Sequence, residues 1–505
     1  MNQHVRTKPK LLRGILVLLF VSIACYFMTR AVFLSYAHVS PVNKAFAIGF
    51  LLAEIFVMFH AFGYFLNIYN QSRHLDAPQP AEGLKQYPPV AILLPARHEP
   101  KEILEQNVIC FCNLEYPNKT IYILDDSSLS SFRQEAEQIA AKYGVHLFRR
   151  DERHGAKAGI INDCLKDLTE KYIAIFDVDQ NPLPGFLFQT IPLLEADPKL
   201  AFVQTPQFYS NLGSSKVAFA ADMQQSVFYE YICEGKSANQ AMIFCGTNGV
   251  LRREALLDAG GLDESTVTED FATSVKLHAR GWKSVYYNHV CTFGMGPEDL
   301  GSYFKQQNRW AMGNVGVLRK IFLRLFTSPR ELRPLQWLEY IITGSYYLIG
   351  WAYLFLILCP ICFLFFSIPT FFLNPVVYAL TFTPYFVLSI AVFYTTMLSR
   401  GYKTPQILQG QLLSFISLPV YMRASLYGII GVRGTFEVTA KGGSKRVPLV
   451  RLWPQIGIWA VCIAAIAWGC NRLVYEPTVA IMVNIVWTLY HALLMSSIFY
   501  FNDAD

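Results

Sequence analysis

Long apolar stretches stand near both ends of this sequence, and a more polar middle separates them. Two come early and four come late, near Ile15–Leu34, Phe46–Ile68, Trp337–Phe366, Pro375–Leu398, Trp453–Cys470 and Val479–Tyr500. The hydrocarbon core of a bilayer is roughly 30 Å thick, so a helix needs about 20 apolar residues to cross it. The pattern therefore predicts six transmembrane helices, two before and four after a large domain.

In the middle of the chain, short runs of branched apolar residues alternate with segments of helical periodicity. The runs predict strands at Val90–Leu94, Thr120–Leu124, Val145–Phe148, Tyr172–Phe176 and Ala201–Val203. The periodic segments predict helices at Lys101–Leu114, Phe132–Tyr143, Lys157–Lys166 and Phe186–Leu194. We also expect a capping box at Ser131–Gln134. This alternation predicts a mostly parallel sheet with helices on both faces, whose ligands gather at the carboxyl ends of the strands.

Composition and charge support a membrane protein. Of the 505 residues, 53% are hydrophobic and 16% are charged, whereas a soluble domain carries about 25% charged residues. The net charge of +6 is explained by basic residues in segments such as Arg400–Arg451, which the positive-inside rule places in the cytosol. We therefore expect a multi-pass protein of the plasma or inner membrane, with a cytosolic middle domain and no nucleic-acid partner.

Two further features of composition exclude other readings. The basic start (Arg6, Lys8, Lys10, Arg13) precedes a long apolar run without a clear small-residue cleavage site, so we expect an uncleaved anchor. The eleven cysteines are scattered, and the Cys359–Cys362 pair lies inside an apolar stretch, which favours packing over zinc binding. We expect no disulfide framework.

Acidic residues follow two of the predicted strands. Asp125-Asp126 follows one strand, and Asp177-Val178-Asp179 follows another. Acidic residues at such places are often only turn formers. However, alternate carboxylates at a strand end can also share a hard cation such as Mg²⁺, which bridges diphosphate oxygens. Lys157, within His154–Gly159 near a predicted helix start, is either a solvated lysine or a phosphate ligand.

Two more motifs complete an ordered series. Thr268-Glu269-Asp270 opens a helical pattern, where an acidic pair also favours the helix dipole. Gln306-Gln307-Asn308-Arg309-Trp310 follows before the third apolar stretch. The i, i+3 spacing puts Gln306 and Arg309 on one helix face, where both can hold a diphosphate. Trp310 is either a membrane-interface anchor or a face on which a sugar ring stacks.

Together and in this order, these motifs resemble the processive family 2 glycosyltransferases, the group of cellulose and hyaluronan synthases. Phe436–Gly442 (FEVTAKG) matches the FxVTxKG gating-loop pattern of bacterial cellulose synthase catalytic subunits, and Val203–Gln207 and Phe244–Thr247 also resemble that group. The resemblance covers residues 90–500. It implies a GT-A-like domain inserted between transmembrane helices, a Mg²⁺ or Mn²⁺ cofactor, UDP-glucose as donor and a growing glucan as acceptor.

The resemblance also implies a role for each matching position. Glu99, Asp125 and Lys157 would bind the uridine and diphosphate, with Asp177 and Asp179 holding the metal. Asp270 would be the general base of a single inverting displacement. Gln306 and Arg309 would hold the leaving UDP. Trp310 with Cys245, Gly246 and Thr247 would contact the acceptor. The gating loop would close over the nucleotide through Phe436, Val438, Thr439 and Lys441.

Three departures from the cellulose synthase pattern stand out. Ala96-Arg97-His98-Glu99 replaces the usual Thr-Tyr-Asn-Glu, so a uracil-stacking tyrosine is missing, although the flat guanidinium of Arg97 could stack instead. Two spans rather than more precede the catalytic domain. We expect no C-terminal cyclic-di-GMP-binding domain, because the sequence ends within a few residues of the sixth span.

We expect a membrane region at 1–70, a cytosolic glycosyltransferase domain ending in an interfacial helix at 71–330, and a second membrane region at 331–505. An interfacial helix and the gating loop would occupy 404–450. Ile407–Ile430 is apolar, but Gln409, Gln411, Arg423 and Pro419 interrupt it, so we expect it to lie in the interface.

The expected function is a processive β-glucan synthase, with a β-1,4 bond favoured and the lipid bilayer as its surroundings. An accessory export subunit is a candidate partner. A β-1,3- or mixed-linkage glucan, a polymer of another UDP-sugar, a non-processive lipid glycosyltransferase and a non-catalytic export channel stay open as alternatives.

Overall fold

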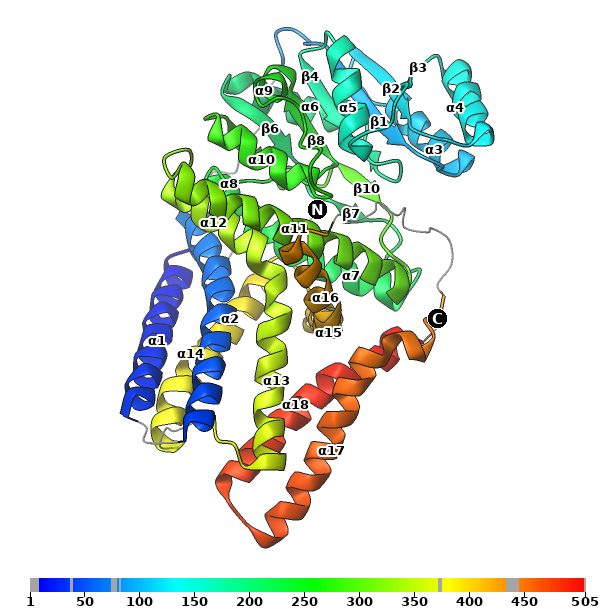
Figure 1. Cartoon of the computed structure of the whole chain (residues 1–505). Helices are drawn as coiled ribbons and strands as arrows, with labels where there is room; N and C mark the ends of the chain where they lie inside the picture. The colour runs from blue at the N-terminus through cyan, green and yellow to red at the C-terminus, as the bar shows by residue number, and fades with distance from the viewer. Residues whose placement is uncertain are drawn as a thin grey trace.

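The computed structural model describes residues 9–36, 40–73, 80, 83–370, 375–432 and 445–503. Figure 1 shows two apolar helices at the N-terminus, an α/β domain at one end of the molecule, and a second group of long helices toward the C-terminus. Helix α11 (Leu300–Thr327) crosses between the α/β domain and the helices below it.

A seven-stranded sheet forms the centre of the α/β domain, in the order β3-β2-β1-β4-β8-β6-β9. Its strands are β1 (Val90–Ala96), β2 (Lys119–Asp125), β3 (His146–Phe148), β4 (Tyr172–Ile175), β6 (Leu200–Gln204), β8 (Gly249–Arg252) and β9 (Lys283–Tyr286). Neighbouring strands run parallel except β8, which is antiparallel to both β4 and β6. The mostly parallel sheet is confirmed, and each of the five predicted strands is present within two residues of its expected bounds.

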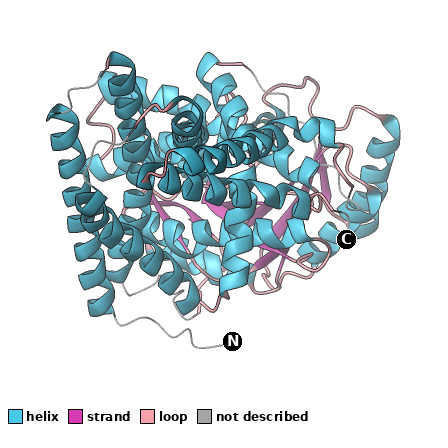
Figure 2. Ribbon diagram, turned by 90° about the horizontal axis from the view of Figure 1, so that it is seen from below, coloured by secondary structure: helices cyan, strands magenta, loops and turns pink. Residues whose placement is uncertain are grey.

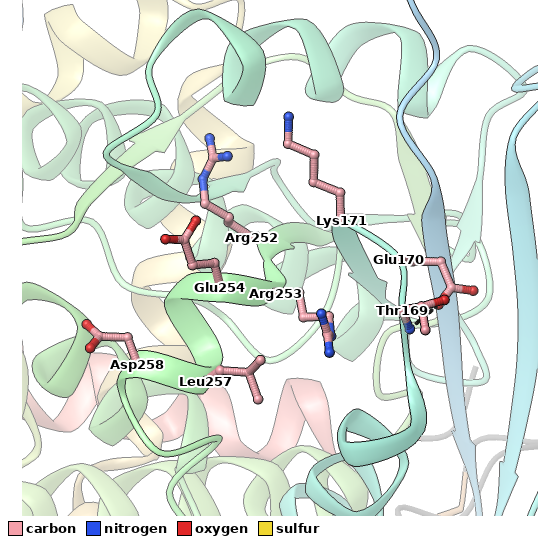
Figure 3. A pocket seen from close by; sticks show the side chains of 8 residues that line it. All are labelled: Thr169, Glu170, Lys171, Arg252, Arg253, Glu254, Leu257 and Asp258. Atoms are coloured by element: carbon pink, nitrogen blue, oxygen red, sulfur yellow. Dashed lines mark hydrogen bonds between the residues drawn. The ribbon is translucent and has the colours of Figure 1, made fainter.

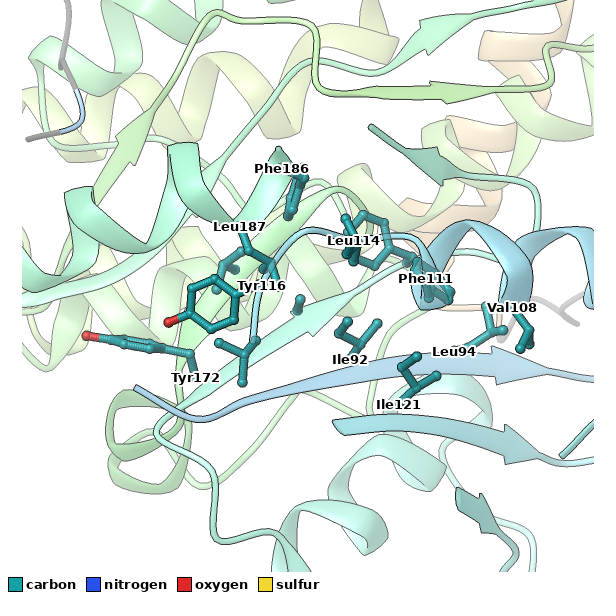
Figure 4. Close-up of a cluster of buried hydrophobic side chains, with 14 of the residues drawn as sticks. Ile92, Leu94, Val108, Phe111, Leu114, Tyr116, Ile121, Tyr172, Phe186 and Leu187 are labelled. Carbon is teal, nitrogen blue, oxygen red and sulfur yellow. The ribbon is translucent and has the colours of Figure 1, made fainter. Parts of the chain in front are cut away.

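Both faces of this sheet are buried, which explains why its strands read as continuous apolar runs. Val90, Ile92 and Leu94 of β1 pack into one cluster with side chains of helices on one face of the sheet (Figure 4). Ala91 and Leu93, which point the other way, join a second cluster with side chains of the helix at Ala156–Asp167. The two clusters hold the strand ends, and therefore the residues that follow them, in fixed positions.

The helices of this domain are α3 (Lys101–Cys112), α4 (Ser130–Tyr143), α5 (Ala156–Asp167), α6 (Phe186–Ala196), α7 (Lys216–Val227), a π-helical turn η1 (Phe228–Ile232), α8 (Cys233–Ala238), α9 (Arg253–Asp258) and α10 (Glu269–Ala279). A small sheet of β5 (Asn181–Pro182), β10 (Thr292–Gly294) and β7 (Phe208–Tyr209) lies beside the main one. The expected capping box is wrong, because α4 starts at Ser130 after Leu129, with no side-chain cap, and Ser131 lies inside its first turn.

Six helical segments among the described residues are long and apolar enough to cross a membrane. They are α1 (Pro9–Tyr36), α2 (Pro41–Arg73), α12 (Pro334–Ser345) continued by η2 (Tyr346–Leu348) and α13 (Ile349–Phe366), α14 (Pro375–Ser399), η3 (Leu449–Leu452) continued by α17 (Trp453–Tyr475), and α18 (Val479–Phe501). The predicted six spans are confirmed as such helices, and the protein is a multi-pass membrane protein. Figure 2, seen from below, shows helices in front of the strands.

Helices α15 (Thr404–Ile416) and α16 (Leu418–Ile430) form a pair bent by 50°. The bend falls just before Pro419, as its ring predicts. Each helix of the pair packs closely on a neighbouring helix. A Cβ on Gly410 would come within 2.9 Å of the Gln224 backbone nitrogen in α7, and one on Gly428 within 2.7 Å of the Met312 oxygen in α11. The interfacial assignment of this pair stays a prediction.

Candidate active site

The parallel strands β1, β2 and β4 end at one edge of the sheet. Glu99 lies three residues past β1, Asp125 ends β2, and Asp177 and Asp179 follow β4. Because β8 is antiparallel, its start at Gly249 lies at the same edge, paired with Ile175. The topology therefore brings together residues that are widely separated in the sequence.

Lys157 stands in the first turn of α5 and enters the site from the side. Gly155 and Ala156 just before it have φ angles of 57° and 48°, a left-handed region that residues other than glycine seldom adopt. The Lys157 Nζ donates to Asp177 Oδ1 at 2.5 Å and to the Gly246 backbone oxygen at 2.7 Å. Burial lowers the pKa of Lys157, but the nearby carboxylates, Asp177 first, raise it more, so the amine stays charged.

Asp177 and Asp179 lie in the turn after β4, and both are half-buried while Val178 between them is buried. The Asp177 backbone N–H donates to the Thr247 hydroxyl at 3.0 Å, which fixes the turn. The described residues contain no group of three or more His, Cys, Asp or Glu side chains that could hold a metal. Two hard carboxylates fit Mg²⁺ or Mn²⁺ of the kind that takes its other ligands from water and substrate phosphate.

The segment from Cys245 to Asn248 connects these elements. Gln204 at the end of β6 accepts from the Cys245 N–H at 2.9 Å and donates to the Thr247 oxygen at 2.8 Å. The Thr247 hydroxyl is engaged within the protein, by Asp177 and Asn248. Gly246 has a φ of 81°, and a Cβ there would lie 3.0 Å from Asp270 Oδ2. The segment thus contacts Lys157 through the Gly246 oxygen and lies directly beside Asp270.

Glu269 and Asp270 open α10 and face the same site. Burial raises the pKa of Asp270, and the adjacent Glu269 carboxylate raises it further, to about 7. Burial also raises the pKa of Glu269. Lys157 and Arg309 oppose both shifts, because each cation favours the ionised carboxylates. A carboxyl group with a pKa near 7 is suited to accept a proton at neutral pH.

Helix α11 brings Gln306, Arg309 and Trp310 to this site. The Gln306 side chain lies near Tyr209 and lowers the pKa of its hydroxyl, which burial raises, and Arg309 acts electrostatically on Glu269 and Asp270. Trp310 is half-buried and packs against the apolar cluster that continues into the membrane helices. A sugar-stacking role for Trp310 and a packing role are both compatible with this position.

Arginines that sequence reasoning missed surround the aspartates at the end of β2. Asp125 is buried and accepts from Arg149 Nε at 2.8 Å and from the Ser127 N–H at 3.0 Å. Asp126 accepts two hydrogen bonds from Arg150, each at 2.9 Å. Arginines in a loop are usually interpreted as solvated charges. The grouping of three arginines at 149–153 was the only feature of the sequence that could have indicated partners for the aspartates. If Asp125 binds the sugar nucleotide, its carboxylate does so while it also accepts the hydrogen bond from Arg149.

The loop after β1 carries Arg97, His98 and Glu99. His98 has a φ of 55° and accepts a hydrogen bond from the Ser128 N–H at 3.0 Å through its Nε2. Burial lowers the pKa of Arg97, and the positive charges of Arg153 and Arg150 lower it further. Glu99 is half-buried in this loop. The gating-loop residues Phe436, Val438, Thr439 and Lys441 lie at 433–444, outside the described residues.

A separate surface hollow of about 590 Å³ lies at the other ends of the strands, away from the site residues; Figure 3 shows the side chains that line it. It is lined by Thr169, Glu170, Lys171, Arg252, Arg253, Glu254, Leu257 and Asp258. Lys171 precedes β4 and Arg252 ends β8, whereas Asp177 follows the other end of β4. The hollow contains none of the predicted site residues.

Comparisons with known proteins show what this chain is similar to. A family model described as glycosyl transferase family group 2 matches residues 172–396. The chain is 28% identical over 440 residues to the UDP-forming cellulose synthase catalytic subunit of Pseudomonas fluorescens, covering 82% of this chain and 56% of that one. It is 28% identical over 312 residues to probable glucomannan 4-beta-mannosyltransferase 1 of Arabidopsis thaliana, covering 57% of this chain and 56% of that relative.

The chain thus spans little more than half the length of these two curated relatives. Among solved structures, it is similar to a mannosyltransferase from Pyrobaculum calidifontis in complex with GDP-Man and Mn²⁺. That match has a TM-score of 0.52 at 18% identity and covers 75% of this chain and 99% of that one. At this identity the likeness shows the fold alone, which is a GT-A-like domain joined to apolar helices.

Proposed function

We propose that this chain, whose residues 172–396 match a model of glycosyl transferase family group 2, is a membrane-embedded inverting glycosyltransferase that polymerises glucose from UDP-glucose into a β-glucan. We favour a β-1,4 bond and passage of the polymer through the protein's own helices. The observation that carries the proposal is one edge of the sheet where Lys157, Asp177, Asp270 and Arg309 act on one another. The relation to a cellulose synthase supports the choice of donor.

In this reaction Asp270 is the general base. Its carboxylate takes the proton of the acceptor hydroxyl as that oxygen attacks the anomeric carbon, and the bond from that carbon to the diphosphate breaks. The base stands on the side opposite the leaving group, so a single displacement inverts the anomeric configuration and an α-linked donor gives a β-linked product. The pKa of about 7 leaves a sizeable ionised fraction at neutral pH.

Charge on the departing nucleotide is balanced by cations of the site. Lys157 and Arg309 are held beside the carboxylates, and Gln306 on the same face of α11 as Arg309 supplies an amide. Such positioned cations stabilise negative charge as it develops. Asp177 and Asp179 would hold Mg²⁺ or Mn²⁺, which when bound neutralises diphosphate charge. Glu99 and Asp125 at the ends of β1 and β2 are the proposed contacts to the uridine.

A hydrogen-bonded network of polar side chains, most of them buried, joins α7, α11 and α16 and supports passage of a sugar chain. The Tyr303 hydroxyl donates to Gln224 Oε1 at 2.6 Å, Gln224 Nε2 donates to the Tyr421 hydroxyl at 3.2 Å, and that hydroxyl donates to Gln307 Oε1 at 3.2 Å. The rings of Tyr346 and Tyr347 lie 6.4 and 5.1 Å from the ring of Tyr421. Hydroxyl and amide groups can exchange partners with sugar hydroxyls, and aromatic faces can stack on sugar rings.

We place the catalytic domain in the cytosol. Nucleotide sugars are made in the cytosol. The positive-inside rule also places the basic segment Arg400–Arg451 there. The bent α15–α16 pair leaves residues 433–444, with the gating motif, on that side if it does not cross the bilayer. Labelling of a cysteine placed at Lys441 from outside sealed cells would contradict this topology.

The decisive experiment uses the purified protein in lipid vesicles. It is given each UDP-sugar in turn, and a GDP-linked mannose because one relative is named as a mannosyltransferase, with Mg²⁺, Mn²⁺ or a chelator. Polymer that forms from UDP-glucose with metal and is digested by a β-1,4-specific glucanase supports the proposal. Polymer from another donor, a polymer with another linkage, or a single sugar on lipid would each identify an alternative. An Asp270→Asn variant that still makes polymer would remove the proposed base.

A further inference from the structure

His154 links two segments that carry different parts of the proposed chemistry. It lies three residues before Lys157, and its Nδ1 is 2.7 Å from Glu264 Oε2, six residues before Asp270. Its Nε2 is 2.8 Å from Asp163 Oδ2 in α5. We call His154 with Glu264 and Asp163 the His154 bridge. Both partners are carboxylates, which accept hydrogen bonds when ionised, so both ring nitrogens must donate and the ring must be an imidazolium.

The backbone at this bridge leaves little freedom. A Cβ on Gly155 would come within 2.3 Å of Glu264 Oε2, and Gly155 and Ala156 both have positive φ angles. Arg150 closes the other side of the loop by donating to the Ala156 oxygen at 3.2 Å. The turn that delivers Lys157 is therefore packed directly against Glu264.

The segment from Leu262 to Thr266, on the far side of the bridge, is fixed in turn. Asn162 of α5 donates to Glu264 Oε1 at 2.7 Å and accepts from the Leu262 N–H at 2.8 Å. Asp263 forms ion pairs with Lys276 of α10 at 3.2 Å and with Lys320 of α11 at 3.6 Å. This segment thus contacts the helix of Asp270 and the helix of Arg309.

We propose that His154 is a positioning residue, whose imidazolium ties the loop of Lys157 to segment 262–266 and so holds the phosphate-binding lysine at a fixed place relative to the base. This inference rests on the proposed function. His154 touches no reacting atom and acts through these two segments. Loss of its second proton would remove the hydrogen bond from His154 to one of the two carboxylates and would loosen the loop.

The charged groups around His154 determine its response to pH. Glu264 and Asp163 face it, while Lys166 pairs with Asp163 at 2.8 Å and Arg150 lies 3.8 Å from the same carboxylate. The hydrogen bond to Glu264 is the largest cause that raises the pKa of His154, and the charges of both carboxylates add to it, although burial opposes them. The bridge is then complete below the raised pKa and is lost as pH rises through it.

The test compares His154→Gln and His154→Lys in vesicles, with His146→Gln as a matched control, because His146 is an exposed histidine of β3 in the same domain. We expect His154→Gln to lower kcat about tenfold at neutral pH, the loss of a charge-assisted contact. It should also remove the decline of activity at alkaline pH. His154→Lys, which keeps a cation, should restore activity at alkaline pH. The control should leave both unchanged.

Hydrogen exchange of the full chain gives a readout that needs no catalysis. Peptides covering 149–157 and 260–266 should exchange faster in His154→Gln and, after correction for intrinsic rates, faster in the wild type above the pKa of His154. A wild type without transferase activity would refute the proposed function, whereas these peptides would still report on the bridge. Superimposable pH profiles and exchange rates for wild type and His154→Gln would overturn the inference.

Discussion

Lys157 and Asp177 form an ion pair, with the amine 2.5 Å from a carboxylate oxygen, at the point where α5 meets the end of β4. The side chain of the lysine is 15% exposed, and Glu269 and Asp270 act on the same amine. One cation is therefore shared among three carboxylates. Its removal should disturb the site far more than the loss of one surface charge.

A Lys157→Met change should lower the rate of glycosyl transfer more than about a hundredfold, because like charges are left unbalanced and a phosphate contact is lost. The pKa of Asp270 should rise further, since Lys157 now lowers it. Part of the activity should therefore return at a higher pH than the wild type needs, where Asp270 ionises again. Lys142→Met is the control, because Lys142 is 63% exposed and pairs with Glu105. Full activity in Lys157→Met would refute this role.

Activity should rise with pH through about 7, the pKa of Asp270, because the base must be ionised to accept a proton. Below that value the rate should fall about tenfold per pH unit. Glu269→Gln removes the neighbouring negative charge, so the rising limb should move to lower pH. Initial rates measured with saturating donor across the pH range test both statements. If the rising limb of the pH profile stays in place in Glu269→Gln, the charge of Glu269 does not raise the pKa of Asp270.

Gly246→Ala should strain the backbone and should also inactivate the enzyme, because the added methyl group crowds the Asp270 carboxylate. Its φ of 81° is unfavourable for alanine, and the new Cβ would lie 3.0 Å from the Asp270 carboxylate. Gly144→Ala is a matched control, because Gly144 has a φ of 66° and nothing within 4 Å of an added Cβ. Both variants should lose about 1 kcal/mol of stability, whereas activity should fall in Gly246→Ala alone. Equal activities would place Asp270 away from this glycine.

The pattern of apolar residues was sufficient for the main elements of the fold. Strand β1 could be predicted because both of its faces are buried, which gives an unbroken apolar run. Strand β8 was not among the predicted strands, and the four residues Gly249–Arg252 carry no signal of its reversed direction. The capping box failed since α4 begins one residue earlier than Ser131 and leaves no role for its hydroxyl.

The candidate site could be predicted where residues follow strands in sequence, as with Asp125 and Asp177. Contacts between distant segments left no such signal. Arg149 lies 24 residues from Asp125 and His154 lies 110 from Glu264, yet both are hydrogen-bonded pairs. Polar residues in loops read as solvated, and whether they are partnered depends on how the chain returns to the site.

A buried ion pair joins the catalytic domain to the membrane helices and should be essential for stability. Lys236 of α8 donates to Glu339 Oε2 of α12 at 2.9 Å, both side chains are 2% exposed, and Asn239 donates to Glu339 Oε1 at 2.8 Å. Lys236→Met leaves an uncompensated carboxylate and should cost about 3–5 kcal/mol. Replacing both residues with methionine should recover much of this, because no charge is then left buried.

Thermal unfolding in detergent, followed by tryptophan fluorescence, measures these effects. Lys171→Met is the comparison, because Lys171 and Glu195 form an ion pair with 44% and 33% of their side chains exposed. An exposed pair of this kind contributes less than about 1 kcal/mol. If Lys236→Met unfolds at the same temperature as Lys171→Met, the buried pair does not stabilise the junction. If the double variant is less stable than Lys236→Met, the amides around Glu339 depend on the carboxylate more than on the charge balance.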